Sequence, residues 1–259
     1  MTTLEIRQLP ILSDNYIYLI RDPSSGAVGV VDPAGVTPVL REVERSGWKI
    51  THVLNTHHHQ DHVGGNYELK WLTGCKIVGP AVDDRRIPGI DFRVNDGDVF
   101  LFGDAKAEII FVPGHTTGHI AYWFRDSNAL FCGDTLFSIG CGRVFEGTPA
   151  QMWQSLLRLR ALPPETRVYC AHEYTQANIQ FALTVDAENE ALRRRAADVN
   201  DARAHGRPTV PSLLSDEIAA NPFLRADQPE LAEAVGMVGK DAAEVFAEIR
   251  RRKDIFKAA

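Results

Sequence analysis

The stretch Thr56-His57-His58-His59-Gln60-Asp61-His62 decides how the rest of this chain is interpreted. Four of its seven residues are imidazoles and a fifth is a carboxylate, so it concentrates groups that bind metal ions. In an extended segment alternate side chains point to the same side. We therefore expect His57 and His59 to converge on one point and His58 to face away.

The second half of the stretch predicts a neighbouring metal position. Asp61 and His62 stand just before Gly64-Gly65, a pair that predicts a turn and would aim both side chains beside the first point. Imidazole nitrogen and carboxylate oxygen suit zinc, iron or manganese, whereas calcium and magnesium take mostly oxygen ligands. The sequence therefore predicts two adjacent sites for transition-metal ions.

Three later segments each present a further candidate ligand where a β-rich run ends. The runs 107–112, 129–132 and 168–171 are followed by His115, Asp134 and His172, just as the run 49–55 delivers the first cluster. Strand ends commonly build sites in α/β folds, so we expect these side chains to meet. The alternative, ordinary hydrogen-bonded core histidines, is disfavoured because the placement repeats at four strand ends.

These candidates divide into two ligand sets. We assign His57, His59 and His115 to one ion, and Asp61, His62 and His172 to the other. A carboxylate has two oxygens, so Asp134 is the natural bridge between the ions. His58 and His119 are expected to lie outside the coordination, with His119 orienting a neighbouring ligand. Asp61 and Asp134 are also the expected catalytic carboxylates.

Composition narrows the class of protein. The chain has 259 residues and a net charge of −6, which argues against bulk attraction to nucleic acid or to an anionic membrane. No apolar run approaches the ~20 residues of a membrane-spanning helix, and we expect no secretion signal. The four cysteines lack CxxC spacing, so we expect thiols in a reducing cytoplasm. We expect a monomer.

The elements predict an α+β fold in two domains. Short β-rich runs alternate with helical ones up to about residue 173, and from there the chain is almost entirely helical in pattern. We therefore expect a metal-binding catalytic domain over 1–173 and a helical substrate-binding domain over 174–259.

The motifs resemble those of a known superfamily. His-x-His-x-Asp-His, Gly-His-Thr-x-Gly-His, Gly-Asp-Thr and a late His, in this order, resemble the metallo-β-lactamase superfamily, whose fold is an αβ/βα sandwich with metals at one edge. Within it, several segments are similar to glyoxalase II, the hydroxyacylglutathione hydrolases: Ser13-Asp14-Asn15-Tyr16, Phe137-Ser138-Ile139-Gly140-Cys141-Gly142-Arg143, Glu146-Gly147-Thr148, Cys170-Ala171-His172-Glu173-Tyr174-Thr175, Asn221-Pro222-Phe223 and the tail 250–256.

The resemblance implies a substrate and the residues that bind it. Glyoxalase II cleaves S-D-lactoylglutathione and related S-2-hydroxyacylglutathiones to the hydroxy acid, here D-lactate, and glutathione, as the second step of methylglyoxal detoxification. It implies that Arg143, Tyr174, Arg250 and Lys253 bind the glutathione moiety. Position 143 is often Lys in relatives, so Arg143 keeps the charge and changes its geometry. At about 100° per residue, Arg250 and Lys253 also share one helical face with apolar neighbours.

The resemblance further implies a mechanism and leaves rivals open. Two divalent ions, zinc or alternatively iron or manganese, would hold a bridging hydroxide that attacks the thioester carbonyl. The nearest rival is a mononuclear-iron persulfide dioxygenase of the same fold, against which the full set Asp61, His62 and His172 counts. The net charge of −6 disfavours a phosphodiesterase or a nuclease. From another class, the chain could be a non-catalytic metal-binding scaffold.

Overall fold

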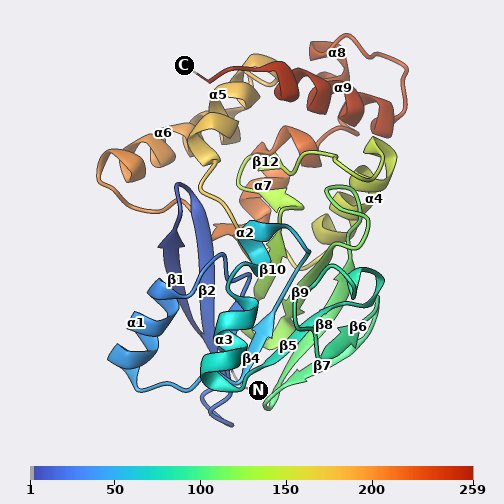
Figure 1. Ribbon diagram of the computed structural model, residues 1–259. Coiled ribbons are helices and arrows are strands. Elements are labelled where there is room, and N and C mark those ends of the chain that lie inside the picture. The colour runs from blue at the N-terminus through green and yellow to red at the C-terminus, as the bar shows by residue number, and fades with distance from the viewer. Residues whose placement is uncertain (1–2, 259) are drawn as a thin grey trace. The chain divides into compact units, whose positions relative to one another are not determined.

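The structure, a computed structural model, describes residues 3–258 (Figure 1). Backbone contacts divide the chain into two compact units. The N-terminal unit consists of residues 1–111 and 117–133, and the C-terminal unit of residues 112–116 and 134–259. The loop 112–116 thus belongs to the C-terminal unit although it lies between strands of the other. The domain boundary predicted near residue 173 stays a prediction.

The N-terminal unit contains two sheets and three helices. Its first sheet has the order β1 (Glu5–Ile11), β2 (Asn15–Arg21), β3 (Val28–Val31), β4 (His52–Leu54), β5 (Lys76–Pro80) and β6 (Phe92–Val94), antiparallel up to β3 and parallel beyond it. A second, antiparallel set is β7 (Val99–Phe102), β8 (Ala105–Phe111), β9 (Ile120–Phe124) and β10 (Ala129–Gly133). The helices are α1 (Thr37–Ser46), α2 (Gln60–Val63) and α3 (Asn66–Thr73), with 3₁₀ turns η1 (Ala81–Asp83) and η2 (Arg125–Ser127).

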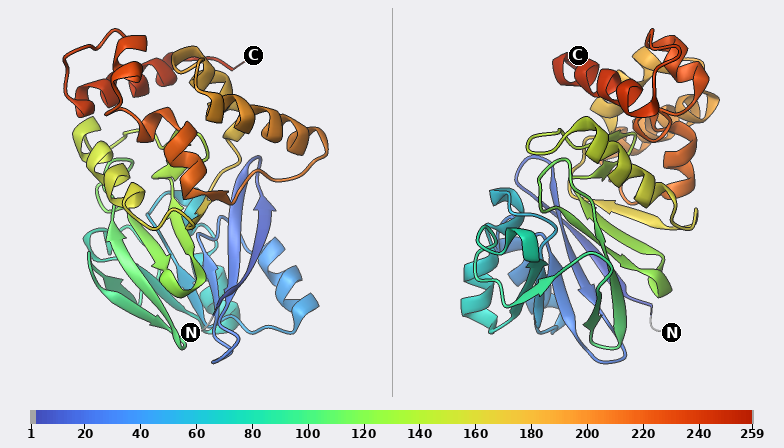
Figure 2. Two further views of the ribbon diagram at one scale, coloured as in Figure 1. Left: turned by 180° about the vertical axis from the view of Figure 1, so that it is seen from behind. Right: turned by 90° about the vertical axis from the view of Figure 1, so that its right-hand side faces the viewer.

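The two sheets of the N-terminal unit pack face to face (Figure 2). The rings of Tyr18 on β2 and Phe131 on β10 lie 5.4 Å apart, and the Tyr122 hydroxyl donates to the Asn55 carbonyl at 2.9 Å. On the other face of the first sheet, α1 and α3 bury Val39 and Leu69 completely. These layers bury β3 and β4, whose ends carry the residues of interest.

The C-terminal unit is mainly helical. It contains the hairpin β11 (Leu136–Phe137) and β12 (Gly140–Cys141), the pair β13 (Arg167–Cys170) and β14 (Ser212–Leu213), and the helices α4 (Pro149–Arg160), α5 (Thr175–Val185), α6 (Glu190–Ala204), α7 (Leu214–Ala220), α8 (Pro229–Ala234) and α9 (Ala242–Ile255), with the 3₁₀ turn η3 (Pro222–Leu224). Capping boxes at Thr148 and Asp241 begin α4 and α9. These two helices pack through Trp153 and Phe246, whose rings lie 6.1 Å apart.

The turn expected at Gly64-Gly65 is present, and it directly follows a single turn of helix, α2, that carries Asp61 and His62. Gly64 has an ordinary helical φ of −58°. Gly64 is required for close packing instead, since a Cβ there would lie 2.7 Å from the Ala34 carbonyl oxygen. The two side chains are delivered next to the first histidine pair along the chain.

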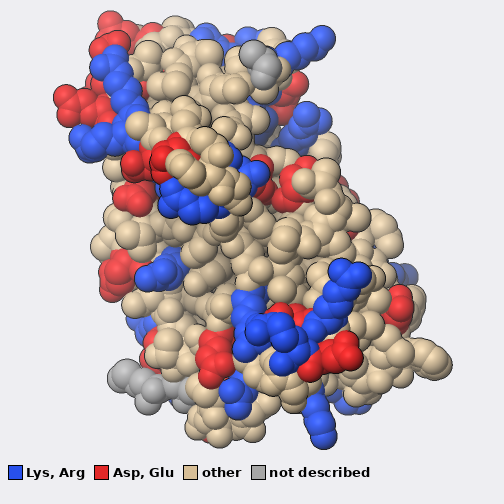
Figure 3. Space-filling view, turned by 90° about the vertical axis from the view of Figure 1, so that its left-hand side faces the viewer, with Lys and Arg blue, Asp and Glu red and all other residues tan. Residues whose placement is uncertain are grey.

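Three further expectations concern the cysteines, membranes and surface charge. All four cysteines are buried and free, as predicted. Within residues 3–258, no helix has the length and apolar character needed to span a membrane. Figure 3 shows basic and acidic side chains interspersed on one face of the molecule. The expected lack of a nucleic-acid partner stays a prediction.

Candidate active site

The first histidine pair converges as the extended pattern predicts. His57 Nε2 and His59 Nδ1 lie 3.1 Å apart, and their rings are 4.7 Å apart. His58 faces the other way, with its Nδ1 3.2 Å from Asp83 Oδ2. The alternation inferred from sequence is therefore confirmed, and two imidazole nitrogens are directed at one region of the N-terminal unit.

The second pair is held by a residue that sequence reasoning missed, Asp32. His62 Nε2 lies 3.5 Å from Asp61 Oδ2, while His62 Nδ1 lies 3.1 Å from Asp32 Oδ2. An Nδ1 proton donated to this carboxylate leaves Nε2 with the lone pair that a metal ion requires. Asn15 fixes the other member of the pair, because its amide donates to Asp61 Oδ2 at 3.0 Å.

The rule that identified the other candidates, a possible ligand directly after a β-rich run, also applies to Asp32. It directly follows β3, and the parallel register of Val31 with Leu54 brings it to the chain leaving β4. Its carboxylate accepts from the Thr56 backbone N–H at 2.8 Å and from the Thr56 hydroxyl at 2.6 Å. Asp32 thus anchors the start of the histidine stretch as well as His62.

His119, which we expected to orient a neighbouring ligand, lies against His57. The two rings are stacked, 4.6 Å apart and tilted by 17°. His119 Nδ1 donates to the Ile120 carbonyl at 3.0 Å, which fixes the ring. The His119 ring therefore stacks on the ring of His57. That His119 orients a neighbouring metal ligand stays a prediction.

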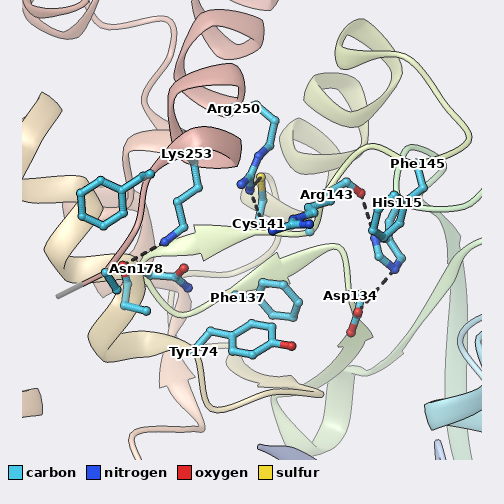
Figure 4. Close-up of a pocket in the computed structure, with 14 residues that line it drawn as sticks. His115, Asp134, Phe137, Cys141, Arg143, Phe145, Tyr174, Asn178, Arg250 and Lys253 are labelled. Atoms are coloured by element: carbon cyan, nitrogen blue, oxygen red, sulfur yellow. Dashed lines mark hydrogen bonds and ion pairs between the residues drawn. The ribbon is translucent and has the colours of Figure 1, made fainter.

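The C-terminal unit brings together the other three predicted ligands. Asp134 Oδ2 lies 3.4 Å from His115 Nε2, and Asp134 Oδ1 lies 3.4 Å from His172 Nε2 (Figure 4 shows the His115 contact). All three side chains are buried. His115 Nδ1 donates to the Arg143 carbonyl at 2.8 Å, which turns Nε2 toward the carboxylate. One oxygen for each histidine is the arrangement expected of a bridging carboxylate.

A cavity of about 520 Å³ adjoins these ligands within the C-terminal unit (Figure 4). Its volume lies within the range of small-molecule sites. The cavity is lined by His115, Asp134, Phe137, Cys141, Gly142, Arg143, Phe145, Tyr174, Ala177, Asn178, Arg250, Lys253, Phe256 and Ala258. All four residues that we expected to bind substrate, Arg143, Tyr174, Arg250 and Lys253, are in this list.

Two of the cations are anchored on α9. Arg250 is only 6% exposed; its Nη1 donates to the Cys141 carbonyl at 3.0 Å and its Nε to Asp254 at 3.0 Å. Lys253 Nζ donates to the Ala177 carbonyl at 2.9 Å. Burial and the neighbouring Arg250 charge lower the pKa of Lys253 to about 8. A half-buried ammonium beside another cation favours an anionic ligand.

The remaining pocket residues differ in exposure. The Arg143 side chain is 63% exposed, with Nε 3.9 Å from Asp254 Oδ1. The Tyr174 ring stacks on His172 at 4.7 Å with an interplanar angle of 4°, and the Phe145 ring lies 5.2 Å from that of His115.

Burial raises the pKa of the Cys141 thiol to about 11. This thiol is therefore protonated at neutral pH, which does not favour a nucleophilic cysteine.

Comparisons with known proteins match both parts of the chain. Residues 12–172 match the model of the metallo-beta-lactamase superfamily, and residues 173–256 match that of the hydroxyacylglutathione hydrolase C-terminus. A hydroxyacylglutathione hydrolase of Methylococcus capsulatus is 59% identical over 98% of this chain and 99% of its own length. Another, of Rhodospirillum rubrum, is 60% identical over 99% of this chain and its full length. The chain belongs to the hydroxyacylglutathione hydrolase family.

Solved structures agree with the metallo-beta-lactamase fold. ETHE1 from Myxococcus xanthus superposes with a TM-score of 0.68 at 26% identity, covering 95% of this chain and 90% of its own. The BLEG-1 B3 metallo-beta-lactamase gives 0.66 at 18% identity over 85% of this chain and 99% of its own, which shows the fold. TTHA1623, solved in a di-iron-bound form, gives 0.54 at 27% identity over 65% of this chain and 91% of its own. The predicted metallo-β-lactamase fold with a C-terminal helical region is confirmed, and the chain binds divalent metal.

Proposed function

We propose that the chain hydrolyses S-D-lactoylglutathione and related S-2-hydroxyacylglutathiones to the hydroxy acid and glutathione. The observation that carries this proposal is the cavity in which Arg250 and Lys253 face the same space as Asp134 and His115. Cations for a substrate carboxylate thus lie beside predicted metal ligands. The family, represented by hydroxyacylglutathione hydrolases at 59% and 60% identity over nearly the whole chain, supports the same reaction over a persulfide dioxygenase.

We further propose that seven side chains hold two divalent ions. His57, His59 and His115 would bind one ion, Asp61, His62 and His172 the other, and Asp134 both. The donor chemistry fits, because imidazole nitrogen and carboxylate oxygen suit zinc, with iron or manganese as alternatives. The two oxygens of Asp134, each 3.4 Å from a different histidine, support the bridging role. The di-iron form of TTHA1623 supports the proposal of two metal ions per chain.

Bound divalent ions would acidify a water molecule to hydroxide near neutral pH and polarise the thioester carbonyl. The chain's own residues prepare the ligands for this. His62 Nδ1–H donates a hydrogen bond to Asp32, and His115 Nδ1–H donates one to the Arg143 carbonyl. The Nε2 lone pair of each ring is therefore available to a metal ion. The tautomers are therefore set before any ion binds.

The substrate is held by the part that does not react. Arg250, Lys253 and Arg143 would bind the carboxylates of glutathione, and Tyr174, stacked on His172, would line the path to the thioester. The leaving thiolate has a conjugate acid of pKa about 8.5, so its departure requires no strong general acid. The four free cysteines support the predicted reducing cytoplasm, and the monomeric state stays a prediction.

The experiment is thiol release from S-D-lactoylglutathione, with D-lactate measured in parallel. We expect one thiol per D-lactate from the metal-loaded wild type, and no turnover from Asp134→Ala. The matched control is Arg251→Gln, an exposed cation on the same helix as Arg250, which should behave as wild type. Oxygen uptake with glutathione persulfide and no thioester cleavage would instead establish the rival dioxygenase.

A further inference from the structure

The motif Asn221-Pro222-Phe223 and the turn between β11 and β12 are not explained by the ligands and cations above. We propose that Glu217 and Asn221 are positioning residues for the reaction: they hold this turn, and through it the backbone carbonyls that orient His115 and Arg250. The inference rests on the proposed function for its kinetic consequences, whereas its structural basis lies wholly within the C-terminal unit.

The turn 137–140 is bonded by side chains from distant parts of the sequence. The Ile139 N–H donates to Glu217 Oε2 at 2.7 Å. The Asn221 amide donates to the carbonyls of Phe137 at 3.2 Å and Gly140 at 3.0 Å, and to Glu217 Oε2 at 3.0 Å. Glu217 and Asn221 therefore act as one unit that bonds three backbone groups of the turn.

A second amide and a guanidinium complete the support. Asn178 on α5 donates to the Ser138 carbonyl at 3.1 Å, and Arg195 on α6 donates to the Ser138 hydroxyl at 3.2 Å. Glu217 and Asn221 are both 0% exposed. Buried polar groups persist where they are hydrogen-bonded, and the bonds of Glu217 Oε2 and of the Asn221 amide favour one conformation of the turn.

The conformation of the turn explains why such support is needed. Ile139 has a φ of +54°, in the left-handed region that β-branched residues rarely occupy. Its side chain is completely buried in a core with Ile179, Leu192 and Val199. A residue persists in this region only where its surroundings enforce it. The apolar core fixes the Ile139 side chain, and Glu217 fixes its backbone.

The segment 141–143, which leaves the turn, supplies two carbonyls to the site. The Cys141 carbonyl accepts from Arg250 Nη1 at 3.0 Å, and the Arg143 carbonyl accepts from His115 Nδ1 at 2.8 Å. One carbonyl therefore orients a predicted substrate cation, and the other sets the tautomer of a predicted metal ligand. Displacement of the turn would disturb both, because only one residue separates Cys141 from Arg143.

The test compares Asn221→Ala and Glu217→Leu with Glu217→Gln and a control, Asn189→Ala. Both hydrogen bonds to Glu217 go to Oε2, so the amide oxygen of Gln can accept them in its place. Asn189 caps α6, with its oxygen 3.1 Å from Leu192 N. Its loss lowers stability by removing this cap and the bond from the Asn189 amide to the Ala219 carbonyl of α7 at 3.0 Å, and Asn189 makes no bond to the turn.

Three experiments are done on each variant: zinc affinity by chelator competition, the Kd of the thioether S-methylglutathione, and steady-state kinetics with S-D-lactoylglutathione. We expect Asn221→Ala and Glu217→Leu to weaken zinc binding about tenfold or more and to raise both Kd and KM. Glu217→Gln and Asn189→Ala should remain within about twofold of wild type in all three, because both leave the turn bonded.

The inference is wrong if Asn221→Ala and Glu217→Leu have the same zinc affinity and the same Kd for S-methylglutathione as Asn189→Ala. If Asn221→Ala does not fold, Asn178→Ala replaces it, because it removes the bond to the Ser138 carbonyl. Asn178 also lines the cavity, so zinc affinity is the quantity compared for this variant. A wild-type zinc affinity there, together with wild-type values for Glu217→Leu, overturns the inference equally. A wild type that binds zinc but does not cleave the thioester refutes the proposed function. The zinc comparison still decides the positioning role in that case.

Discussion

Raising the pH from 7 to 9 should weaken substrate binding by removing the positive charge of Lys253. Burial, with the nearby Arg250 charge, lowers the pKa of this ammonium from 10.5 to about 8. The side chain is therefore charged below about pH 8 and neutral above it. A cation that binds a substrate carboxylate is thus present at pH 7 and largely lost at pH 9.

The size of the effect follows from the pKa. Roughly nine-tenths of Lys253 would be protonated at pH 7 and roughly one-tenth at pH 9, so KM should rise about five- to tenfold over this interval. A hydrogen bond to a charged group contributes about 1.5–3 kcal/mol, which corresponds to ~10- to ~150-fold in binding. The lower strength gives the fivefold end of the expected rise in KM, and the upper strength gives the tenfold end. The kcat should not follow this titration, because Lys253 binds a part of the substrate that does not react.

The assay is initial-rate thiol release at pH 7, 8 and 9, with spontaneous hydrolysis subtracted. Lys253→Arg is the matched variant, since guanidinium stays protonated throughout this range; its KM should be nearly constant. Lys253→Met should have a high KM at every pH. A wild-type KM that does not change between pH 7 and 9, or a rise of equal steepness in Lys253→Arg, would refute the reasoning.

Three further outcomes are expected. Asp32→Asn should weaken zinc binding about 10- to 100-fold in chelator competition, because His62 loses the carboxylate that sets its tautomer; unchanged affinity would contradict this. Arg250→Met should raise KM about tenfold with little change in kcat, whereas Arg251→Met should change neither. Phe223→Ala, which empties a buried site between the rings of Phe181 and Phe246, should lower the free energy of unfolding by about 3–5 kcal/mol in urea denaturation; a loss below 1 kcal/mol would contradict that packing.

Elements with a strong local signal could be predicted from the sequence. Helix α1 has such a signal, because its apolar period and the left-handed Gly47 that ends it are both local features. The extended alternation after β4 correctly separated His58 from its two neighbours. Ligands at strand ends were equally accessible, since each follows a recognisable β-rich run.

Features that depend on distant contacts could not be predicted in this way. The role of Asp32 depends on the parallel pairing of β3 with β4, which only the folded sheet reveals. Likewise, the Asn221 amide bonds Phe137, 84 positions earlier in the chain, and no local period links the two. Helix α7, which carries Glu217, was not predicted because its seven residues are too few to show a clear apolar period.

The most direct test of the proposed metal centre is anomalous X-ray scattering from crystals of the zinc-loaded enzyme. The account predicts two zinc peaks per chain, one bonded by His57, His59 and His115 and the other by Asp61, His62 and His172, with Asp134 between them. A single peak, or zinc bound by other side chains, would contradict the account.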